Sequence, residues 1–209
     1  MEKSKRYSAE EVGNLYNDRA GAYNAARWVE EKILGTGRLR SGLLPKAVGN
    51  VLDVACGGGA NFRYLKEATS ITGVDVSEEM LGFARREGEK LGIYPTLTVM
   101  DAANLQFEDG YFDTVISTLS TCTFPDPIKT LQEMGRVAKP GGRILLMEHG
   151  RSRWEWVARF QDRRAGAHYE RSGCRWNQEP EGLVAEAGLK IVGHRRHLIG
   201  IFHAIEVAV

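Results

Sequence analysis

The chain has 209 residues, of which 43% are hydrophobic and 26% charged, a composition that is ordinary for a globular protein and excludes an intrinsically disordered one. Lysine and arginine number 28 and acidic residues 27, so bulk charge does not favour generic nucleic-acid binding. The length predicts a single domain over residues 1–209.

The first 45 residues predict a helical cap. Apolar side chains recur at spacings of three and four from Ala9 to Leu34, as they do on one face of a helix. Ser8 and Glu11 have the spacing of a capping box at its start. Several glycines and Pro45 then interrupt the pattern.

Strand and helix signals alternate through the middle of the chain. Apolar runs predict strands at 50–55, 70–76, 96–100, 112–117 and 143–148, with helices at 61–67, 78–91 and 127–137. A short helix at 179–187 precedes strands at 189–192 and 202–209. About nine residues join these last strands, too few for a helical crossover, so they should be antiparallel. The expected fold is α/β and Rossmann-like: a doubly wound, mostly parallel seven-stranded sheet with an antiparallel last strand, plus the N-terminal helical cap.

The pattern of cysteines, the N-terminal sequence and the short apolar runs indicate a soluble, cytoplasmic protein. Cys56, Cys122 and Cys174 are far apart and form no CxxC pair, so neither a zinc ribbon nor a thioredoxin-type site is expected. No Asp/His cluster has metal-ligand spacing, and we predict no metal. The N-terminus carries charges where a signal peptide needs an apolar core, and the apolar runs are only strand-length.

A glycine loop follows the first strand and precedes a helix signal. Gly57, Gly58 and Gly59 stand where an α/β sheet binds nucleotide-like ligands. Asp75 ends the second strand, 16 residues beyond Gly59, where a carboxylate can accept hydrogen bonds from both ribose hydroxyls. Phe62 occupies the third glycine position of a dinucleotide motif, which disfavours a nicotinamide-dependent oxidoreductase but leaves it as an alternative.

The motifs resemble those of class I S-adenosylmethionine (SAM)-dependent methyltransferases over nearly the whole chain. VLDVACGGGANF (51–62) resembles the first motif and GVDVS (73–77) the second, and GRVAKPGGRILLMEHG (135–150) resembles the turn and fifth strand. Ala55 stands where glycine is commoner, which should be tolerable if its backbone is not left-handed. Within this class, the sequence resembles the methyltransferase type 11 family, which is similar to the quinone-biosynthesis methyltransferases.

The resemblance implies SAM as the cofactor, with S-adenosylhomocysteine as the product. Asp101 and Ala102 resemble the pair that recognises adenine, and Tyr16 and Tyr23 resemble tyrosines that close over SAM, although core packing would also explain them. Asp53 either holds the loop through backbone N–H groups or contacts the methionine amino group. The expected cofactor-binding residues are Asp53, Ala55, Cys56, Gly57, Gly59, Asn61, Asp75, Val76, Met80, Asp101, Ala102, Ser117, Tyr16 and Tyr23.

The acceptor is expected to be a small molecule or lipid rather than nucleic acid. The motifs of amino-directed and C5-directed DNA methyltransferases are absent after the fourth strand. EHG (148–150) and SGCRWNQ (172–178) resemble a branch with thiol methyltransferases of internal membranes, phospholipid N-methyltransferases and quinone-biosynthesis relatives. Phospholipid amine, thiol and quinol therefore remain open, as does a non-catalytic SAM-binding module.

The segment 150–178 is expected to be a substrate-side insertion. Residues 151–176 carry seven arginines against three acidic residues, a balance of +4, with five aromatic side chains interleaved. Such a pattern suits a membrane surface or an anionic substrate, so peripheral membrane contact is a candidate; a solvated helix with its tryptophans in the core is the alternative. His149, which ends the fifth strand, is the candidate catalytic residue that orients or deprotonates the acceptor; a hydrogen bond to the loop is the alternative.

Overall fold

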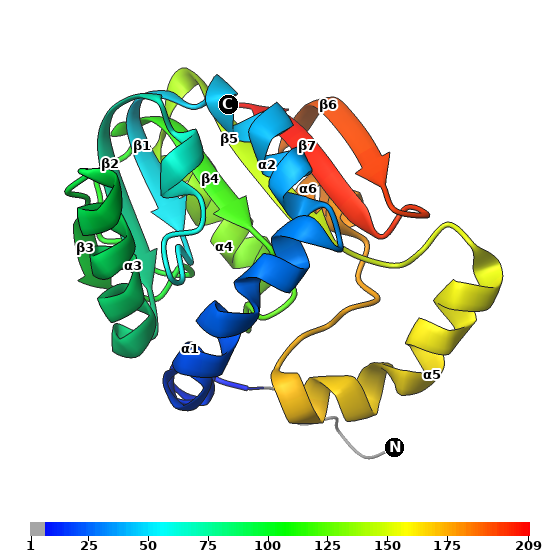
Figure 1. Cartoon of the computed structure of the whole chain (residues 1–209). Coiled ribbons are helices and arrows are strands. Elements are labelled where there is room, and N and C mark those ends of the chain that lie inside the picture. The colour runs from blue at the N-terminus through cyan, green and yellow to red at the C-terminus, as the bar shows by residue number, and fades with distance from the viewer. Residues whose placement is uncertain (1–6) are drawn as a thin grey trace.

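Seven strands form one sheet in the order β3-β2-β1-β4-β5-β7-β6 in the computed structural model, which describes residues 7–209 except for the side chain of Trp28 (Figure 1). The strands are β1 (Val48–Val54), β2 (Glu67–Asp75), β3 (Thr96–Val99), β4 (Phe112–Thr118), β5 (Ala138–His149), β6 (Lys190–His197) and β7 (Phe202–Ala208). The first five strands pair in parallel, whereas β7 runs antiparallel to both β5 and β6. The expected Rossmann-like sheet is confirmed.

The strand order reverses between β1 and β4, and this places the site. The chain moves outward from β1 through β2 to β3 and then crosses to β4 on the other side. In open α/β sheets the crevice outside the carboxyl ends of the strands at such a switch point is where ligands bind. The glycine loop follows β1, so it opens onto this crevice.

Alternate residues of the central strands supply two apolar layers. Val51 and Leu145 face the side covered by α2 (Thr36–Leu43) and α3 (Glu78–Leu91). Leu52, Ile144 and Leu146 face the side covered by α4 (Pro127–Val137) and α6 (Pro180–Glu186). Successive side chains of a strand point to opposite faces, so the middle of each central strand carries apolar residues on both faces. The long α1 (Ala9–Lys32) lies across the first layer, in front of the carboxyl ends of the strands (Figure 1).

Helix boundaries follow their capping residues where the sequence provides them. The Ser77 hydroxyl accepts a hydrogen bond from the Met80 N–H, and α3 begins at residue 78. Asp126 does the same for the Lys129 N–H before α4, with Pro127 in the first turn. Ser8 and Glu11 form the expected capping box of α1. The predicted bounds 78–91 and 127–137 are therefore confirmed.

The helix expected at 61–67 is wrong. A single 3-10 turn, Phe62–Tyr64, stands there, because β2 already begins at Glu67 and pairs with β1. Too few residues separate the glycine loop from this strand for two helical turns. Two further helices form: α2, which contains Gly37 and Gly42 and had no helix assigned from the sequence, and α5 (Glu155–Ser172), for which a helix was the alternative interpretation of residues 151–176.

The helix α5 stands away from the sheet, joined to it by two long connections (Figure 1). Gln161 anchors it: its amide donates to the carbonyls of Gly150 and Trp176 and accepts from the Ser152 N–H. Within residues 7–209, no helix is both long enough and apolar enough to cross a lipid bilayer.

Candidate functional site

A cavity of about 880 Å³, mouth included, lies between α1 and the carboxyl ends of β1, β2 and β4. Of the fourteen cofactor-binding residues expected from the sequence, those that line it are Tyr16, Tyr23, Ala55, Cys56, Gly57, Asp75, Val76, Met80, Asp101 and Ala102. Asp53, Gly59, Asn61 and Ser117 do not line it, and lie behind the loop or in the core.

The loop after β1 bends through several left-handed residues. Gly57 and Gly59 have φ of 53° and 76°, which glycine adopts without strain. Ala55 has φ of 53°, so the condition under which alanine was expected to be harmless is not met. The left-handed backbone brings the Cβ of an L residue close to its own carbonyl, which costs about 1–2 kcal/mol. Glycine, which lacks a Cβ, would avoid this cost at position 55.

Gly58 lies directly against the Asn24 side chain of α1. A Cβ at this position would collide with the amide oxygen of Asn24. Asn24 also donates to the Met80 sulfur at 3.5 Å. The glycine therefore lets α1 pack directly over the loop. The sequence of residues 51–62 alone does not reveal this contact.

Asp75 ties the loop to the second strand. Its Oδ2 accepts from the Gly57 N–H and its Oδ1 from the Ser77 N–H, both at 2.9 Å. The side chain is only 9% exposed, and burial raises its pKa, opposed by these backbone hydrogen bonds. Each carboxylate oxygen has about two lone pairs, so Asp75 retains acceptor capacity toward the cavity that it lines.

Asp53 lies beneath the loop in a buried polar chain. The Asn61 amide donates to both of its oxygens at 3.0 Å. The Asn61 carbonyl in turn accepts from Arg40 Nε and from the Thr118 hydroxyl, each at 3.1 Å. Burial raises the pKa of Asp53 to about 7 even though the hydrogen bond from Asn61 opposes it. Asp53 thus holds Asn61; direct contact with a cofactor stays a prediction.

Gly59 and Ser117 have packing and hydrogen-bonding roles in the structure. A Cβ at Gly59 would lie 2.7 Å from the Phe62 ring. Ser117 is fully buried and its hydroxyl is hydrogen-bonded to that of Ser120. Both residues hold the walls of the cavity without lining it.

The two tyrosines expected to cover the cofactor lie on α1. Tyr16 and Tyr23 contact each other edge-to-face with ring centroids 6.0 Å apart, and both line the cavity. Burial raises the pKa of Tyr16 well above its ordinary value, so its hydroxyl stays protonated at neutral pH. Tyr23 is 40% exposed, which places it at the rim.

Several lining residues were not expected from the sequence. Among them, Asn24, Arg27 and Arg40 come from the cap. Thr118 ends β4, and Leu119, Ser120, Thr123, Phe124 and Pro125 follow it. Leu119 has a left-handed backbone, φ 56°, which turns the chain sharply out of the strand. Asn24 and Arg27 could have been identified from the sequence, because they are polar residues on an otherwise apolar stripe of the helix.

A second group of polar residues lies beside the segment after β4. Glu148 is fully buried and accepts from the N–H groups of Ser120 and Thr121 at 3.0 and 3.2 Å. Burial raises the pKa of Glu148 to about 7. This carboxylate holds the turn that forms one wall of the cavity.

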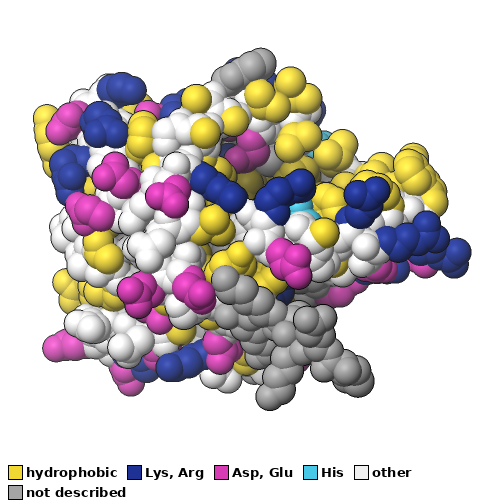
Figure 2. Space-filling view, turned by 90° about the horizontal axis from the view of Figure 1, so that it is seen from below, with side chains coloured by type: hydrophobic (Ala, Val, Ile, Leu, Met, Phe, Trp, Pro, Cys, Tyr) yellow, Lys and Arg dark blue, Asp and Glu magenta, His cyan; other side chains and the backbone are white. Residues whose placement is uncertain are grey.

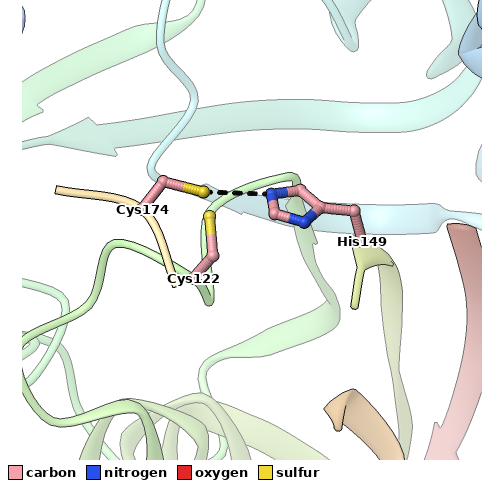
Figure 3. Close-up of side chains that lie close together, drawn as sticks. All are labelled: Cys122, His149 and Cys174. Atoms are coloured by element: carbon pink, nitrogen blue, oxygen red, sulfur yellow. Dashed lines mark hydrogen bonds between the residues drawn. The ribbon is translucent and has the colours of Figure 1, made fainter. Parts of the chain in front are cut away.

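The His149 ring points toward two cysteines, Cys122 and Cys174 (Figure 3). Its Nε2 lies 3.4 Å from Cys174 Sγ, and Cys122 Sγ belongs to the same cluster. The Cys122 thiol and the His149 ring both stabilise the Cys174 thiolate and lower the pKa of Cys174 well below that of a free thiol. His149 does not line the cavity. Its predicted role as the acceptor's base stays a prediction.

Comparisons with known proteins agree with this geometry. Residues 52–146 match the family described as "Methyltransferase domain". The chain is 30% identical to the mitochondrial methyltransferase OMS1 of Saccharomyces cerevisiae, covering 92% of this chain and 45% of that protein. It is 37% identical to a phosphatidylethanolamine N-methyltransferase of Cereibacter sphaeroides, over 48% of this chain and 51% of that one.

The fold is also similar to solved structures. A chain of the Haloferax volcanii complex between the Trm112 methyltransferase activator and a putative methyltransferase superposes with a TM-score of 0.73. That match has 21% identity and covers 92% of this chain and 97% of the other. This chain spans about half the length of the curated relatives it matches.

Proposed function

The chain belongs to the class I SAM-dependent methyltransferases, and from this premise we propose that it transfers the methyl group of SAM to a small-molecule or lipid-like acceptor. The observation that carries the proposal is the Asp75 carboxylate, which is held by two backbone N–H groups and faces a cavity walled by the glycine loop. A ribose needs such an acceptor at this position.

The residues present fit SAM. The loop from Ala55 to Gly58 has no side chain larger than that of Cys56, so its backbone is open to a ligand. We assign the ribose hydroxyls to Asp75, the adenine to Asp101 and Ala102, and the methionine part to the loop beside Met80. Bound SAM supplies a methyl group on a sulfonium, an activated leaving group.

The protein's task is then to position the acceptor and exclude water. Tyr16 and Tyr23 close the cavity from α1, and the segment 118–125 closes it from the opposite side. The neutral phenol of Tyr16 is a hydrogen-bond donor for an acceptor atom. The contact of His149 with Cys174 favours another role for that residue.

The surface of α5 supports a lipid-like acceptor. Trp154, Trp156 and Phe160 are 52%, 70% and 52% exposed at its first turns. Arginines surround them, and Figure 2 shows yellow and dark-blue side chains gathered at the right-hand end of the molecule, which is the α5 end. Exposed indoles among arginines suit the interface of an anionic membrane. We therefore propose peripheral contact with a membrane from the cytoplasmic compartment.

Labelled SAM tests the function. The purified full chain is incubated with SAM carrying a labelled methyl group and a cell extract, and the label is partitioned between organic and aqueous phases. Label in the organic phase is expected, from a phospholipid amine, quinol or hydrophobic thiol. Label only in the aqueous phase would move the acceptor to a polar thiol or amine and remove the membrane proposal.

The matched control is the Asp75→Ala protein, which should leave both phases at background. Absence of transfer by the native protein, with S-adenosylhomocysteine still bound, would replace the enzyme by a SAM-binding module. Binding of NADH in preference to S-adenosylhomocysteine would revive the oxidoreductase alternative.

A further inference from the structure

Three potential metal ligands meet beside the cavity although they are far apart in the chain (Figure 3). Cys122 lies between β4 and α4, His149 ends β5, and Cys174 follows α5. Their ligand atoms, two sulfurs and one imidazole nitrogen, all lie within 4.8 Å of one another. Packing of small buried residues does not require two thiols and a histidine from three separate segments to meet at one point.

The spacing fits a tetrahedral cation. With usual zinc–sulfur and zinc–nitrogen bond lengths, two ligand atoms on one tetrahedral edge are ~3.6 Å apart. Cys174 Sγ and His149 Nε2 are 3.4 Å apart. Thiolates with an imidazole are the ligands that select zinc over magnesium or calcium.

The surrounding hydrogen bonds hold the ligands in position. The Arg175 N–H donates to the Cys122 carbonyl at 2.9 Å, so the two cysteine-bearing segments are joined next to their ligands. The Arg175 guanidinium donates to the Phe124 carbonyl at 2.7 Å. The cluster is therefore preorganised by its own supports.

We propose that Cys122, His149 and Cys174 bind Zn²⁺ through three protein ligands, with a fourth coordination position open. Binding to the two sulfurs as thiolates releases their protons to solvent. Three protein ligands with one open position are the arrangement of catalytic rather than structural zinc sites. This site lies outside the cofactor contacts assigned above and was not expected from the sequence.

A second candidate cluster, Glu181, His194 and His203, does not carry the same inference. The Arg196 guanidinium is paired with Glu181 there. A fixed positive charge on one ligand opposes binding of a cation. The cluster is better explained as an ion-paired support between α6 and the last hairpin.

The position of the zinc suggests which acceptor it would serve. The segment that carries Cys122 also contributes Ser120 and Thr123 to the cavity wall. A thiol that binds the open zinc position would lose its proton to solvent. The thiolate sulfur would then form a bond to the methyl carbon of SAM while the sulfonium–methyl bond breaks and S-adenosylhomocysteine leaves. We therefore favour a thiol among the three acceptor classes; this step rests on the proposed function, whereas zinc binding does not.

Metal binding is tested without any methyl transfer. The reduced full chain is titrated with Zn²⁺ and, separately, with Co²⁺, whose thiolate charge-transfer absorption reports sulfur ligation. One metal per chain with that absorption is expected. Cys122→Ser and Cys174→Ser should each weaken binding by more than the roughly 10–100-fold that loss of a supporting contact costs. Cys56→Ser, the matched control at the remaining cysteine, should bind metal as the native chain does.

Native protein that binds no more Zn²⁺ than the Cys122→Ser/Cys174→Ser double variant would overturn the site. Alkylation of the native chain gives the same answer if the variants fail to fold: Zn²⁺ should protect Cys174, the partly exposed cysteine of the site, and equal labelling of Cys174 with and without Zn²⁺ refutes the site. Addition of 2-mercaptoethanol to the Co²⁺ form should increase the charge-transfer absorption. An unchanged spectrum would mean a closed site and remove the thiol-acceptor step.

Discussion

The two walls of the cavity are built in different ways. Most of the wall that we assign to SAM, the cofactor wall, comes from the stretch from β1 to the start of α3, in which the Gly57 N–H donates to the Asp75 carboxylate; Asp101 and Ala102 complete it from the chain after β3. The opposite wall and its neighbours come from the segment after β4, the end of β5 and the chain after α5, joined by Arg175 and Cys122. A wall built from neighbouring residues can be recognised from the sequence as a motif. A wall assembled from distant segments leaves no such motif, and its residues can differ between proteins with different acceptors.

The sharpest test of the cofactor wall is Asp75→Ala. Two charge-assisted hydrogen bonds to a ribose are worth about 1.5–3 kcal/mol each, so loss of the carboxylate should weaken S-adenosylhomocysteine binding by at least about 100-fold. Calorimetric titration measures it. Asp109→Ala, at an exposed aspartate in the same chain, is the control and should bind normally. An unchanged affinity for Asp75→Ala would remove the ribose assignment and with it the local character of this wall.

The sharpest test of the acceptor side is the pair Trp154→Ser and Trp156→Ser. Withdrawing two exposed indoles from a bilayer interface should cost about 2 kcal/mol in total, on the order of a 30-fold loss of affinity. Sedimentation with vesicles containing anionic phospholipid measures it, and binding of the native chain should fall with added salt.

Tyr94→Ser is the matched control for the membrane test. Tyr94 is 85% exposed but lies outside the α5 surface, next to β3. Its loss should leave vesicle binding unchanged. Equal binding by the double tryptophan variant and the native chain would mean that the α5 surface is simply solvated.

What the sequence could predict follows the same division. The strands, α3 and α4 were predictable because apolar runs, Ser77 and Asp126 act locally. Seven of the expected cofactor residues that line the cavity were predictable because they stand at or just after strand ends, whereas Tyr16, Tyr23 and Met80 lie on α1 and α3 and were expected only from the family resemblance. The encounter of Cys122 with Cys174 was not, because it depends on where α5 returns to the body of the protein. The collision that makes Gly58 necessary depends in the same way on how α1 packs.

Asp53, which lies buried beneath the cofactor wall, should make the free energy of unfolding depend on pH. Burial raises the pKa of Asp53 from 3.8 to about 7, so between these values the folded chain holds a proton that the unfolded chain has lost. Its contribution makes the free energy of unfolding fall as pH rises from about 4 to 7, by at most about 1.4 kcal/mol per pH unit. Asp53→Asn should flatten that fall in urea unfolding experiments.

The control for Asp53 is an aspartate shifted in the opposite direction. A hydrogen bond from Lys139 lowers the pKa of Asp113, so its contribution is lost only as pH falls through the acid range. Asp113→Asn should therefore leave the slope between pH 5 and 7 as in the native chain. Identical slopes for native and Asp53→Asn proteins would mean that Asp53 ionises in place without penalty.

The smallest effect concerns the strain in the local wall itself. Ala55 adopts φ 53°, which costs an L residue about 1–2 kcal/mol, whereas glycine loses about 0.5–1 kcal/mol more conformational freedom on folding. Ala55→Gly should thus stabilise the ligand-free protein by about 0.5–1 kcal/mol in urea unfolding. Ala60→Gly in the same loop, at a residue without positive φ, should destabilise it. If both substitutions destabilise equally, the loop relaxes around Ala55, and the cofactor wall is less rigid than its hydrogen bonds to Asp75 imply.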